Sequence, residues 1–349
     1  MMRICHGAVL ALAVIGLAAC GRNAGEHSYR LFVFGTLVDI TTYDAQRERS
    51  DRAVQQIEAA MQQIDHDWHA WRPGPFTELN ARLAAGETVT LDTVALGQIR
   101  RAAQLSATSH DLFNPAIGKL IAVWGFHNDD APSGPPPTPP QIYALLSARP
   151  TMKDLVFGDG NTLRSTNPSL QLDFGGYTKA LAIDTAIAIL QRHKIHNAIV
   201  NIGGDMRTIG RHGLRHWRIG IRHPQQPGAI ASIETADDEC IFTSGTYERY
   251  FEYQGQTYHH LIDPRNGQPA RGVLSVTVLH KDPAVAETAA KAILIAGVSQ
   301  WQYLAREMGV KQVLVIDQNM QFHATAQMAS RVKFEITPTP DLNISKTVP

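Results

Sequence analysis

The chain has 349 residues, and its 32 lysine and arginine side chains balance 32 aspartate and glutamate side chains. Charged residues make up 18% of the sequence and form no basic run. This excludes a nucleic-acid-binding protein, because phosphate contacts need clustered cations. Hydrophobic residues make up 44% of the chain, which is enough to bury a core and excludes disorder.

Residues 1–19 predict a signal peptide. An apolar run from Ala8 to Ala19 follows Arg3 and is too short to span a bilayer. The run ends in Leu-Ala-Ala before Cys20, the pattern of a bacterial lipoprotein signal that is cleaved before a lipid-modified cysteine. The acyl chains would hold the protein on a membrane of the bacterial envelope, facing the periplasm. Gly21, in place of aspartate, favours the outer membrane over the inner one. An ordinary signal peptide with a coincidental cysteine is the alternative.

The rest of the chain predicts one large domain. Residues 20–29 are small and polar, which is typical of a tether between lipid and fold. The domain is expected over residues 30–336, and residues 337–349 are expected to form a flexible tail. Within the domain, the proline-rich segment 132–140 cannot pack as a helix or a central strand, so it is expected to lead into a short helix from Gln141.

The first elements follow from hydrophobic periodicity. The β-branched and aromatic residues of 31–41 predict two strands or one bent strand, in which Gly35 suggests a bulge or a close approach to a ligand. Apolar residues recur every three or four positions over 51–68, which predicts an amphipathic helix. A second helix is expected over 92–109.

The later half alternates strand and helix patterns, which predicts an α+β fold. The expected strands are 170–174, 197–202, 217–222, 240–243, 275–279 and 312–316. The expected helices are 178–193 and 284–296, and residues 247–261 predict a hairpin. Cys240 is the one thiol of the mature chain and is expected to pack as a small hydrophobe.

Paired glycines end two of the expected strands. The segment Asp173–Lys179 offers free backbone amides and a lysine at the start of a helix, which suits a diphosphate. A turn with a purely geometric role remains the alternative. The segment Asn201–Asp205 repeats the pattern but lacks the spacing of a dinucleotide-binding turn.

Two further segments carry polar and aromatic side chains. Residues 243–250 precede His259 and His260, which point to opposite faces if they lie on a strand and so are not expected to ligate one metal. A serine or threonine nucleophile beside a histidine is conceivable there, but nothing in the sequence fixes its geometry. The aromatic-rich turn 113–126 is suited either to stacking on a flat ring or to core packing.

Taken in order, these segments resemble the ApbE-type FAD:protein FMN transferases, which are periplasmic and often lipid-anchored. The resemblance covers nearly the whole mature chain. It rests on six motifs of this sequence, namely F-G-T at 34–36, F-N-P-A-I-G through W-G-F at 113–126, D-F-G-G-Y-T-K at 173–179, V-N-I-G-G-D at 200–205, T-S-G-T-Y at 243–247 and H-L-I-D-P-R-N-G at 260–267.

The resemblance implies an α+β fold of two interleaved mixed α/β lobes, with a T-fold-like core and a flavin cleft between the lobes. It also implies an activity: with Mg²⁺ on the diphosphate of FAD, the FMN half moves onto a threonine or serine of a target flavoprotein and AMP is released. Three alternatives stay open. They are hydrolysis of FAD to FMN and AMP, a non-catalytic FAD-binding lipoprotein, and electron transfer by a permanently bound flavin.

Site residues are carried over from the matching motifs. The resemblance implies FAD contacts at Phe34, Trp71, Leu112, Phe113, Asn114, Asp173, Lys179, His260 and Ile262. It implies metal ligation by the Gly176 carbonyl and Glu287. The catalytic residues expected at this stage are Glu287 as the proton acceptor, Lys291 and Asp205, with Asp282 as a further candidate acceptor.

The chain departs from the family pattern in the helix that carries the metal ligands. The family reads A-D-x-x-x-T there, whereas residues 286–291 read A-E-T-A-A-K, and an ammonium cannot coordinate a cation. Three interpretations follow. Lys291 neutralises the diphosphate itself; or the metal stays on Glu287 and Gly176; or Glu287 and Lys291 form a structural i,i+4 ion pair. In the loop at 113–118, Asn114 and Ala116 stand where the family has aspartate and threonine.

Overall fold

The structure of the protein is a computed structural model that describes residues 25–44, 46–127 and 132–346. The predicted signal peptide, Cys20 and the first part of the predicted tether lie outside the described residues. No helix in the described part of the chain is long and apolar enough to cross a membrane.

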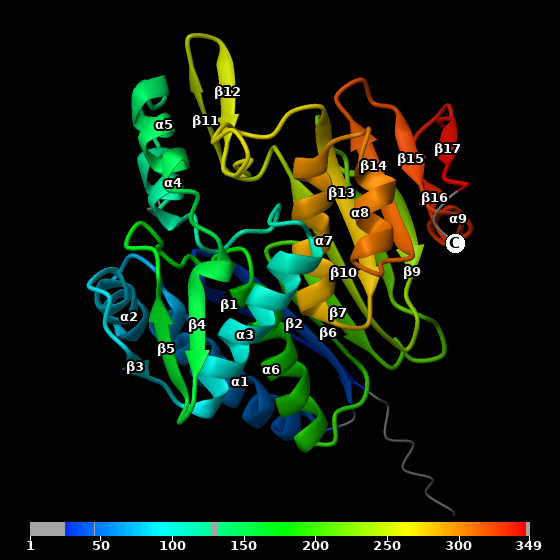
Figure 1. Ribbon diagram of the computed structural model, residues 1–349. Helices are drawn as coiled ribbons and strands as arrows, with labels where there is room; N and C mark the ends of the chain where they lie inside the picture. The colour runs from blue at the N-terminus through cyan, green and yellow to red at the C-terminus, as the bar shows by residue number, and fades with distance from the viewer. Residues whose placement is uncertain (1–24, 45, 128–131, 347–349) are drawn as a thin grey trace, which may run out of the picture.

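One large mixed sheet organises the fold (Figure 1). Its strands run in the order β1-β2-β6-β7-β10-β13-β14-β15-β17, and all neighbours are antiparallel except β15 and β17. Their bounds are β1 Gly25–Val33, β2 Thr36–Asp44, β6 Ala198–Ile202, β7 Asp205–Ile209, β10 Asp238–Gly245, β13 Val273–His280, β14 Gln312–Asp317, β15 Phe322–Ala324 and β17 Leu342–Ile344.

Helices cover one face of this sheet. Helix α1 packs on β1 and β2, α6 packs on β6 and β7, and α7 packs on β10 and β13. Helix α7 also contacts α6 and α8, so the two halves of the sheet share one helical layer. The bounds of these helices and of α3, which adjoins them in Figure 1, are α1 Arg47–Trp68, α3 Thr93–Thr108, α6 Thr178–Arg192, α7 Pro283–Ala296 and α8 Trp301–Glu307.

Smaller elements surround the sheet. A three-stranded sheet of β3, β5 and β4 lies by α2, a second one of β16, β9 and β8 covers the C-terminal half, and α4 and α5 lie beside the β11–β12 hairpin (Figure 1). Their bounds are α2 Pro75–Ala84, β3 Val89–Thr90, α4 Gly118–Val123, α5 Pro139–Ser147, a 3-10 turn at Met152–Asp154, β4 Leu155–Gly158, β5 Thr162–Ser165, β8 Arg218–Arg222, β9 Ala229–Glu234, β11 Tyr250–Tyr253, β12 Gln256–His259, α9 Ala326–Ala329 and β16 Lys333–Phe334.

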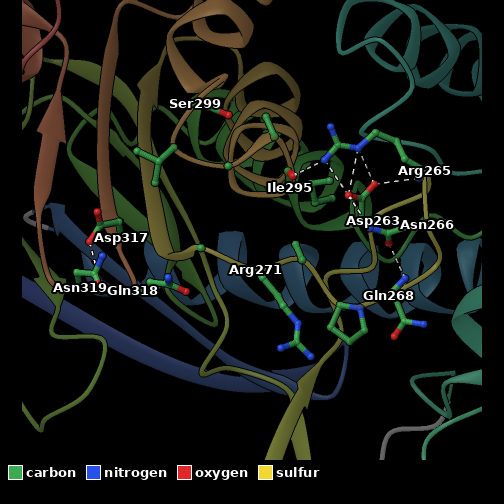
Figure 2. A pocket seen from close by; sticks show the side chains of 16 residues that line it. Asp263, Arg265, Asn266, Gln268, Arg271, Ile295, Ser299, Asp317, Gln318 and Asn319 are labelled. Carbon is green, nitrogen blue, oxygen red and sulfur yellow. Dashed lines mark hydrogen bonds and ion pairs between the residues drawn. The ribbon is translucent and has the colours of Figure 1, made fainter.

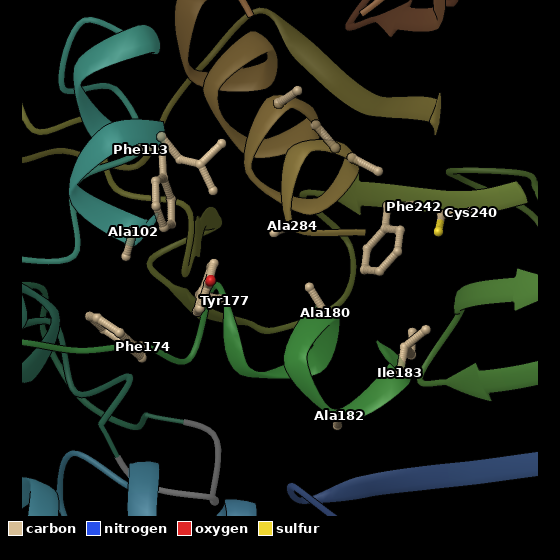
Figure 3. Close-up of a cluster of buried hydrophobic side chains, with 14 of the residues drawn as sticks. Ala102, Phe113, Phe174, Tyr177, Ala180, Ala182, Ile183, Cys240, Phe242 and Ala284 are labelled. Atoms are coloured by element: carbon tan, nitrogen blue, oxygen red, sulfur yellow. The ribbon is translucent and has the colours of Figure 1, made fainter. Parts of the chain in front are cut away.

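The central strands are buried on both faces. In β10, Cys240 and Phe242 face the helical layer, whereas Ile241 joins a second hydrophobic cluster with β8 and β9. Figure 3 shows Phe242 and Cys240 beside Ala180 and Ile183 of α6. Because side chains alternate across a strand, nearly every residue of such a strand must be apolar or small. The prediction that Cys240 packs as a small hydrophobe is confirmed, since its side chain is fully buried.

Most long elements agree with the sequence analysis, but three predictions were wrong. Two concern the ends of the domain, and the third concerns the expected strand 170–174. The expected tether 20–29 overlaps β1, which begins at Gly25, because its backbone pairs with β2 along its whole length. The expected tail 337–349 contains β17, which pairs with β15. The expected strand 170–174 is an extended segment whose one β-type pairing is the bridge from Gln171 to Ile117.

The segment 170–174 is held by a side chain rather than by a sheet neighbour. Asn80 of α2 accepts a hydrogen bond from the Leu172 N–H at 2.8 Å and donates one to the Leu172 carbonyl at 2.9 Å. Its amide therefore replaces one residue of a neighbouring strand. This places the following residues, Asp173 to Gly176, at the N-terminus of α6.

Replacement of Asn80 by alanine is expected to lower the free energy of unfolding by about 2–4 kcal/mol, because two buried backbone groups lose their partner. Chemical denaturation measures the change. Gln191→Ala, on the exposed face of α6, is the control and is expected to stay within about 0.5 kcal/mol of the native protein. A loss for Asn80→Ala no larger than that of the control would contradict this role of the side chain.

Candidate functional site

A cavity of about 560 Å³ lies where α6, α7, the β1–β2 turn and the loops after β6 and β10 meet. All nine side chains that were expected to contact FAD line it. They are Phe34, Trp71, Leu112, Phe113, Asn114, Asp173, Lys179, His260 and Ile262. Gly176, Asp205 and Lys291 line it as well, but Glu287 does not. The structure thus brings together segments that are up to about 250 residues apart in sequence.

Phe34 enters the cavity from a tight turn. The turn joins β1 to β2 through Phe34 and Gly35, whose φ angles are 58° and 65°. Positive φ at both central positions is the geometry of the two-residue hairpin turn. For a bulky residue such as phenylalanine this conformation is unfavourable, and such strain is typical of functional sites. Gly35, for which the sequence suggests a bulge or a close approach to a ligand, is therefore the second residue of this turn.

The loop after β6 packs against the same turn. Gly203 has a φ of 58°, and a Cβ atom at this position would lie 2.8 Å from the Thr36 hydroxyl oxygen. A side chain at position 203 would therefore separate the two turns. Of the paired glycines at 203–204, Gly203 makes this close approach possible, whereas a Cβ atom at Gly204 would meet no neighbouring atom.

Asp173 fixes the wall of the cavity opposite these turns. Its carboxylate accepts a hydrogen bond from Trp71 Nε1 at 3.0 Å and another from the Gly175 N–H at 2.8 Å. The indole ring of Trp71 also lies 5.3 Å from the ring of His127, centroid to centroid. The carboxylate therefore orients a flat aromatic side chain and the backbone that leads into α6.

The side chain of Asn114 forms two hydrogen bonds with nearby backbone groups. Its side-chain oxygen accepts a hydrogen bond from the Ala116 N–H at 3.0 Å, and its side-chain nitrogen donates one to the Pro150 carbonyl at 3.0 Å. The residue is buried, as are Leu112 and Phe113 beside it. At this wall the cavity is lined by a rigid, largely apolar loop.

Lys179 and Asp205 form an ion pair at the wall of the cavity. The ammonium donates to the Asp205 carboxylate, whose other oxygen accepts a hydrogen bond from the Thr243 N–H at 3.1 Å. Burial is the largest influence and opposes the charge on Lys179, but the carboxylates of Asp205, Glu248 and Glu287 together outweigh burial and raise the pKa of the lysine. Lys179 is therefore a permanent cation in the first turn of α6.

Glu287 is fully buried on α7 and turned toward α6. One carboxylate oxygen accepts a hydrogen bond from the Ala180 N–H at 2.8 Å, and the other accepts one from Lys291 Nζ at 3.0 Å. The N-cap residue of α6, Tyr177, makes no side-chain cap. Glu287 thus supplies from another helix the acceptor that an N-cap residue usually provides. Burial raises the pKa of its carboxyl, and Lys291 counteracts this shift.

Lys291 reaches the cavity from the next turn of α7. Its side chain is 15% exposed, and its Cε atom lies 3.2 Å from where a Cβ atom of Gly176 would be. A larger residue at 176 would press on the aliphatic part of this lysine, which would have to shift by a few tenths of an ångström. The ammonium is therefore held between the Glu287 carboxylate and the glycine turn before α6.

His260 lies on the far side of the cavity, after β12. Its Nδ1 atom is 3.1 Å from the Arg249 carbonyl oxygen. A carbonyl can only accept, so Nδ1 carries the proton and Nε2 is the unprotonated nitrogen of the neutral ring. Burial, assisted by the Arg249 guanidinium, lowers the pKa of the ring to about 3. His259, by contrast, is buried and bonded to the Ala270 carbonyl at 2.7 Å.

Glu248 is a cavity residue that the sequence analysis missed. The cavity has four lining carboxylates, and the other three, those of Asp65, Asp173 and Asp205, have partners. Among the described residues Glu248 has neither a hydrogen-bond nor an ion-pair partner. Burial raises its pKa to about 7 against the attraction of Lys179. No sequence pattern indicates this role, because the pattern of residues 247–261 predicts a hairpin and Glu248 lies in the loop between β10 and β11.

A second cavity, of about 690 Å³, lies behind the first, and Ile295 lines both. Its acidic side chains are internally satisfied (Figure 2): Asp263 pairs with Arg265 at 2.7 Å, and Asp317 accepts the Asn319 N–H at 2.8 Å. None of the predicted site residues lines it. Within the described part of the chain, no group of three or more histidine, cysteine or acidic side chains could hold a metal ion.

The raised pKa of Glu248 predicts a pH-dependent loss of stability. The unfolded chain ionises this carboxyl near pH 4.5 and the folded chain near pH 7, so stability falls as pH rises between these values and then stays level. Glu248→Gln removes this loss. Its melting temperature is expected to exceed that of the native protein by roughly 1–3 °C at pH 8 and to match it at pH 4.5. Differential scanning fluorimetry measures both, with the exposed Glu252→Gln as the control. Equal melting temperatures at pH 8 would refute the shift.

The sequence and the fold both match known proteins. The model of the ApbE family matches residues 34–314. A FAD:protein FMN transferase of Rhodobacter capsulatus is 37% identical over 95% of this chain and 62% of its own length. One of Treponema pallidum is 28% identical over 93% of this chain and 94% of its own.

Two solved structures support the same relationship. The ApbE protein of Thermotoga maritima is 26% identical, with a TM-score of 0.80 over 88% of this chain and 99% of that one. A variant of the flavin transferase ApbE of Vibrio cholerae is 25% identical, with a TM-score of 0.76 over 88% of this chain and all of that one. The chain has the mixed α+β fold of these structures and belongs to the ApbE family.

Proposed function

We propose that this protein is a FAD:protein FMN transferase, which attaches FMN from FAD to a threonine or serine of a target flavoprotein and releases AMP. The observation that carries the proposal is the convergence of all nine expected FAD contacts on one cavity. The relatives named FAD:protein FMN transferase support it. The chain spans 62% of the length of the Rhodobacter capsulatus relative and 94% of the Treponema pallidum relative.

We place FAD in the 560 Å³ cavity, between two lobes of a T-fold-like core. The rings of Phe34 and Trp71 suit stacking on the isoalloxazine, since both are flat and one is fixed by Asp173. The turn Gly175–Gly176 and Lys179 suit the diphosphate, because the N-terminus of a helix and an ammonium both attract anions.

In the proposed reaction, the hydroxyl oxygen of the target attacks the phosphorus of the FMN half. The bond from this phosphorus to the bridging oxygen breaks, and AMP leaves with that oxygen. The protein must neutralise the diphosphate charge and accept the hydroxyl proton. The cavity cations Lys179 and Lys291 serve the first need, and Asp205 positions Lys179 through their ion pair.

The proton acceptor is assigned differently here than in the sequence analysis. Glu287 does not fit this role, because its buried carboxylate is engaged by Ala180 and Lys291 and does not line the cavity. Asp282 caps α7 and pairs with Arg101 at 2.7 Å, outside the cavity. We assign proton acceptance to Nε2 of His260, which lacks a proton. A bound diphosphate would raise the pKa of this ring from about 3 toward the working range.

The residues present do not fit a bound Mg²⁺, although the family resemblance implies one. Of the two implied ligands, Glu287 is closed off from the cavity, and the aliphatic part of Lys291 lies beside Gly176. A divalent ion about 4 Å from an ammonium would be repelled by about 8 kcal/mol at an effective dielectric constant of 20. No step of the proposed reaction therefore passes through a metal ion.

We also propose that the protein is a lipoprotein of the bacterial envelope, anchored through Cys20 and facing the periplasm. The sequence around the predicted cleavage site supports this. Gly21 favours the outer membrane. In this arrangement the target flavoprotein must present its acceptor hydroxyl on the periplasmic side.

Incubation of the protein with FAD and an acceptor flavoprotein is expected to add one FMN to the acceptor and to release one AMP. Intact-mass spectrometry of the acceptor and chromatography of the nucleotides measure the two products. An acceptor with alanine at the modified position is the control. Free FMN with AMP would show hydrolysis instead, and unchanged FAD would show a binding protein.

His260→Asn is expected to lower the transfer rate about 10²–10⁴-fold while changing the dissociation constant of FAD less than about threefold, because it removes the proton acceptor but keeps a donor toward Arg249. Single-turnover rates and fluorescence titration separate the two effects. The control is His196→Asn on the exposed surface. An equal loss of affinity and rate would show that His260 binds FAD and does not accept the proton.

A further inference from the structure

We propose that Lys291 is the cation that neutralises the diphosphate of the flavin donor, so that this protein binds FAD without a divalent metal ion. The proposal rests on the proposed function for the identity of the donor. It concerns a residue that distinguishes this chain from the A-D-x-x-x-T pattern.

The first observation is the direction of the two charged side chains on α7. Residues four apart share one face of a helix. Here the carboxylate of Glu287 is fully buried toward α6, while Lys291 continues past it and lines the cavity. The group that α7 presents to a ligand is therefore an ammonium and not a carboxylate.

The second observation is that both oxygens of Glu287 are engaged. A metal ion on this carboxylate would have to displace either the Ala180 N–H, which belongs to the first turn of α6, or Lys291 Nζ. Loss of the first would uncap α6 next to the diphosphate site. Displacement of the second would place the ammonium beside the incoming cation.

The third observation is the place of Lys291 relative to the diphosphate donors. Its Cε atom lies against Gly176, in the turn that opens α6, and Lys179 follows on the same helix. An ammonium has three donor hydrogens, and Glu287 accepts one of them. The other two are available to phosphate oxygens beside the glycine turn that opens α6.

The position of Lys291 is fixed before the ligand binds. Glu287 holds the ammonium at 3.0 Å, and the turn at Gly176 leaves the aliphatic chain little room. The lysine side chain therefore loses little further conformational entropy when the ligand binds. A site of this kind is a preformed anion site.

The deciding experiment uses the full mature protein, freed of metal by chelation and checked for metal content. FAD affinity by fluorescence titration and transfer by mass spectrometry are measured with excess chelator and with Mg²⁺. The dissociation constant of FAD and the transfer rate are expected to differ less than twofold between the two conditions. Binding or transfer that requires Mg²⁺ overturns the proposal while leaving the transferase function intact. FAD binding in chelator without any adduct in either condition refutes the transferase function but not the role of Lys291.

Variants test the residue itself. Lys291→Met is expected to weaken FAD binding at least tenfold. Glu287→Gln keeps one acceptor for the Ala180 N–H but loses the acceptor for Lys291 Nζ, so it is expected to weaken FAD binding in chelator less than Lys291→Met does. Lys333→Met, which removes an exposed cation paired with Glu234, is the charge-matched control. FAD binding that is weaker in a folded Glu287→Gln protein than in Lys291→Met would assign the larger role to the carboxylate and overturn the proposal.

The paired exchange Glu287→Asp with Lys291→Thr supplies the converse test. It restores the family pattern at both positions, and its FAD binding is expected to become dependent on Mg²⁺ by at least tenfold. If this exchange leaves FAD affinity unchanged in chelator, Lys291 does not act as the counter-charge. Circular dichroism of each variant shows whether it is folded.

Discussion

The site depends on one buried carboxylate. Glu287 accepts the Ala180 N–H and the Lys291 ammonium at the same time, and it is fully buried. A buried charge is tolerated only when its partners are in place, because removal from water otherwise costs several kcal/mol. Helix α6 is thereby fixed against α7 at its first turn. This contact sets the spacing of three groups, namely the glycine turn before α6, Lys179 in α6 and Lys291 on α7. All three can therefore approach one ligand.

The two lysines of the cavity are both arranged in ion pairs. Asp205 lies on β7 and holds Lys179 of α6 together with the Thr243 N–H of β10, so it joins three elements at the cavity wall. Each lysine of the site thus has one acidic partner behind it. Glu248 is the exception: it faces the cations without a direct partner, and burial keeps its pKa near 7. An anionic ligand would favour its protonated form, because like charges repel.

The sequence predicted the long elements and the membership of the site, but not its geometry. Periodicity located α1, which buries one face, and the alternation of strand and helix patterns located α6 and α7. The six motifs contain seven of the nine predicted FAD contacts that line the cavity, all but Trp71 and Leu112. Three kinds of information were missing. The segment 170–174 looks like a strand because an extended chain held by Asn80 needs the same apolar residues. Glu287 reads as a ligand in the one-dimensional pattern, and its burial toward Ala180 depends on the packing of two helices. Glu248 gives no sequence signal, because its pKa is set by residues distant in the chain.

A lysine ammonium and a divalent ion can both neutralise the charge of a diphosphate, but they differ in charge and in how the protein holds them. Mg²⁺ brings two charges and keeps several waters, and it is usually bound together with substrate phosphates. Lys291 brings one charge, permanently attached and already oriented by Glu287. The difference must come from other cations that face the cavity, and the structure offers Lys179 and Arg222. The glycine turn of 175–176 matters in this chain because a side chain at position 176 would press on Lys291. With a single positive charge from α7, the correct placement of that charge carries a larger share of the binding.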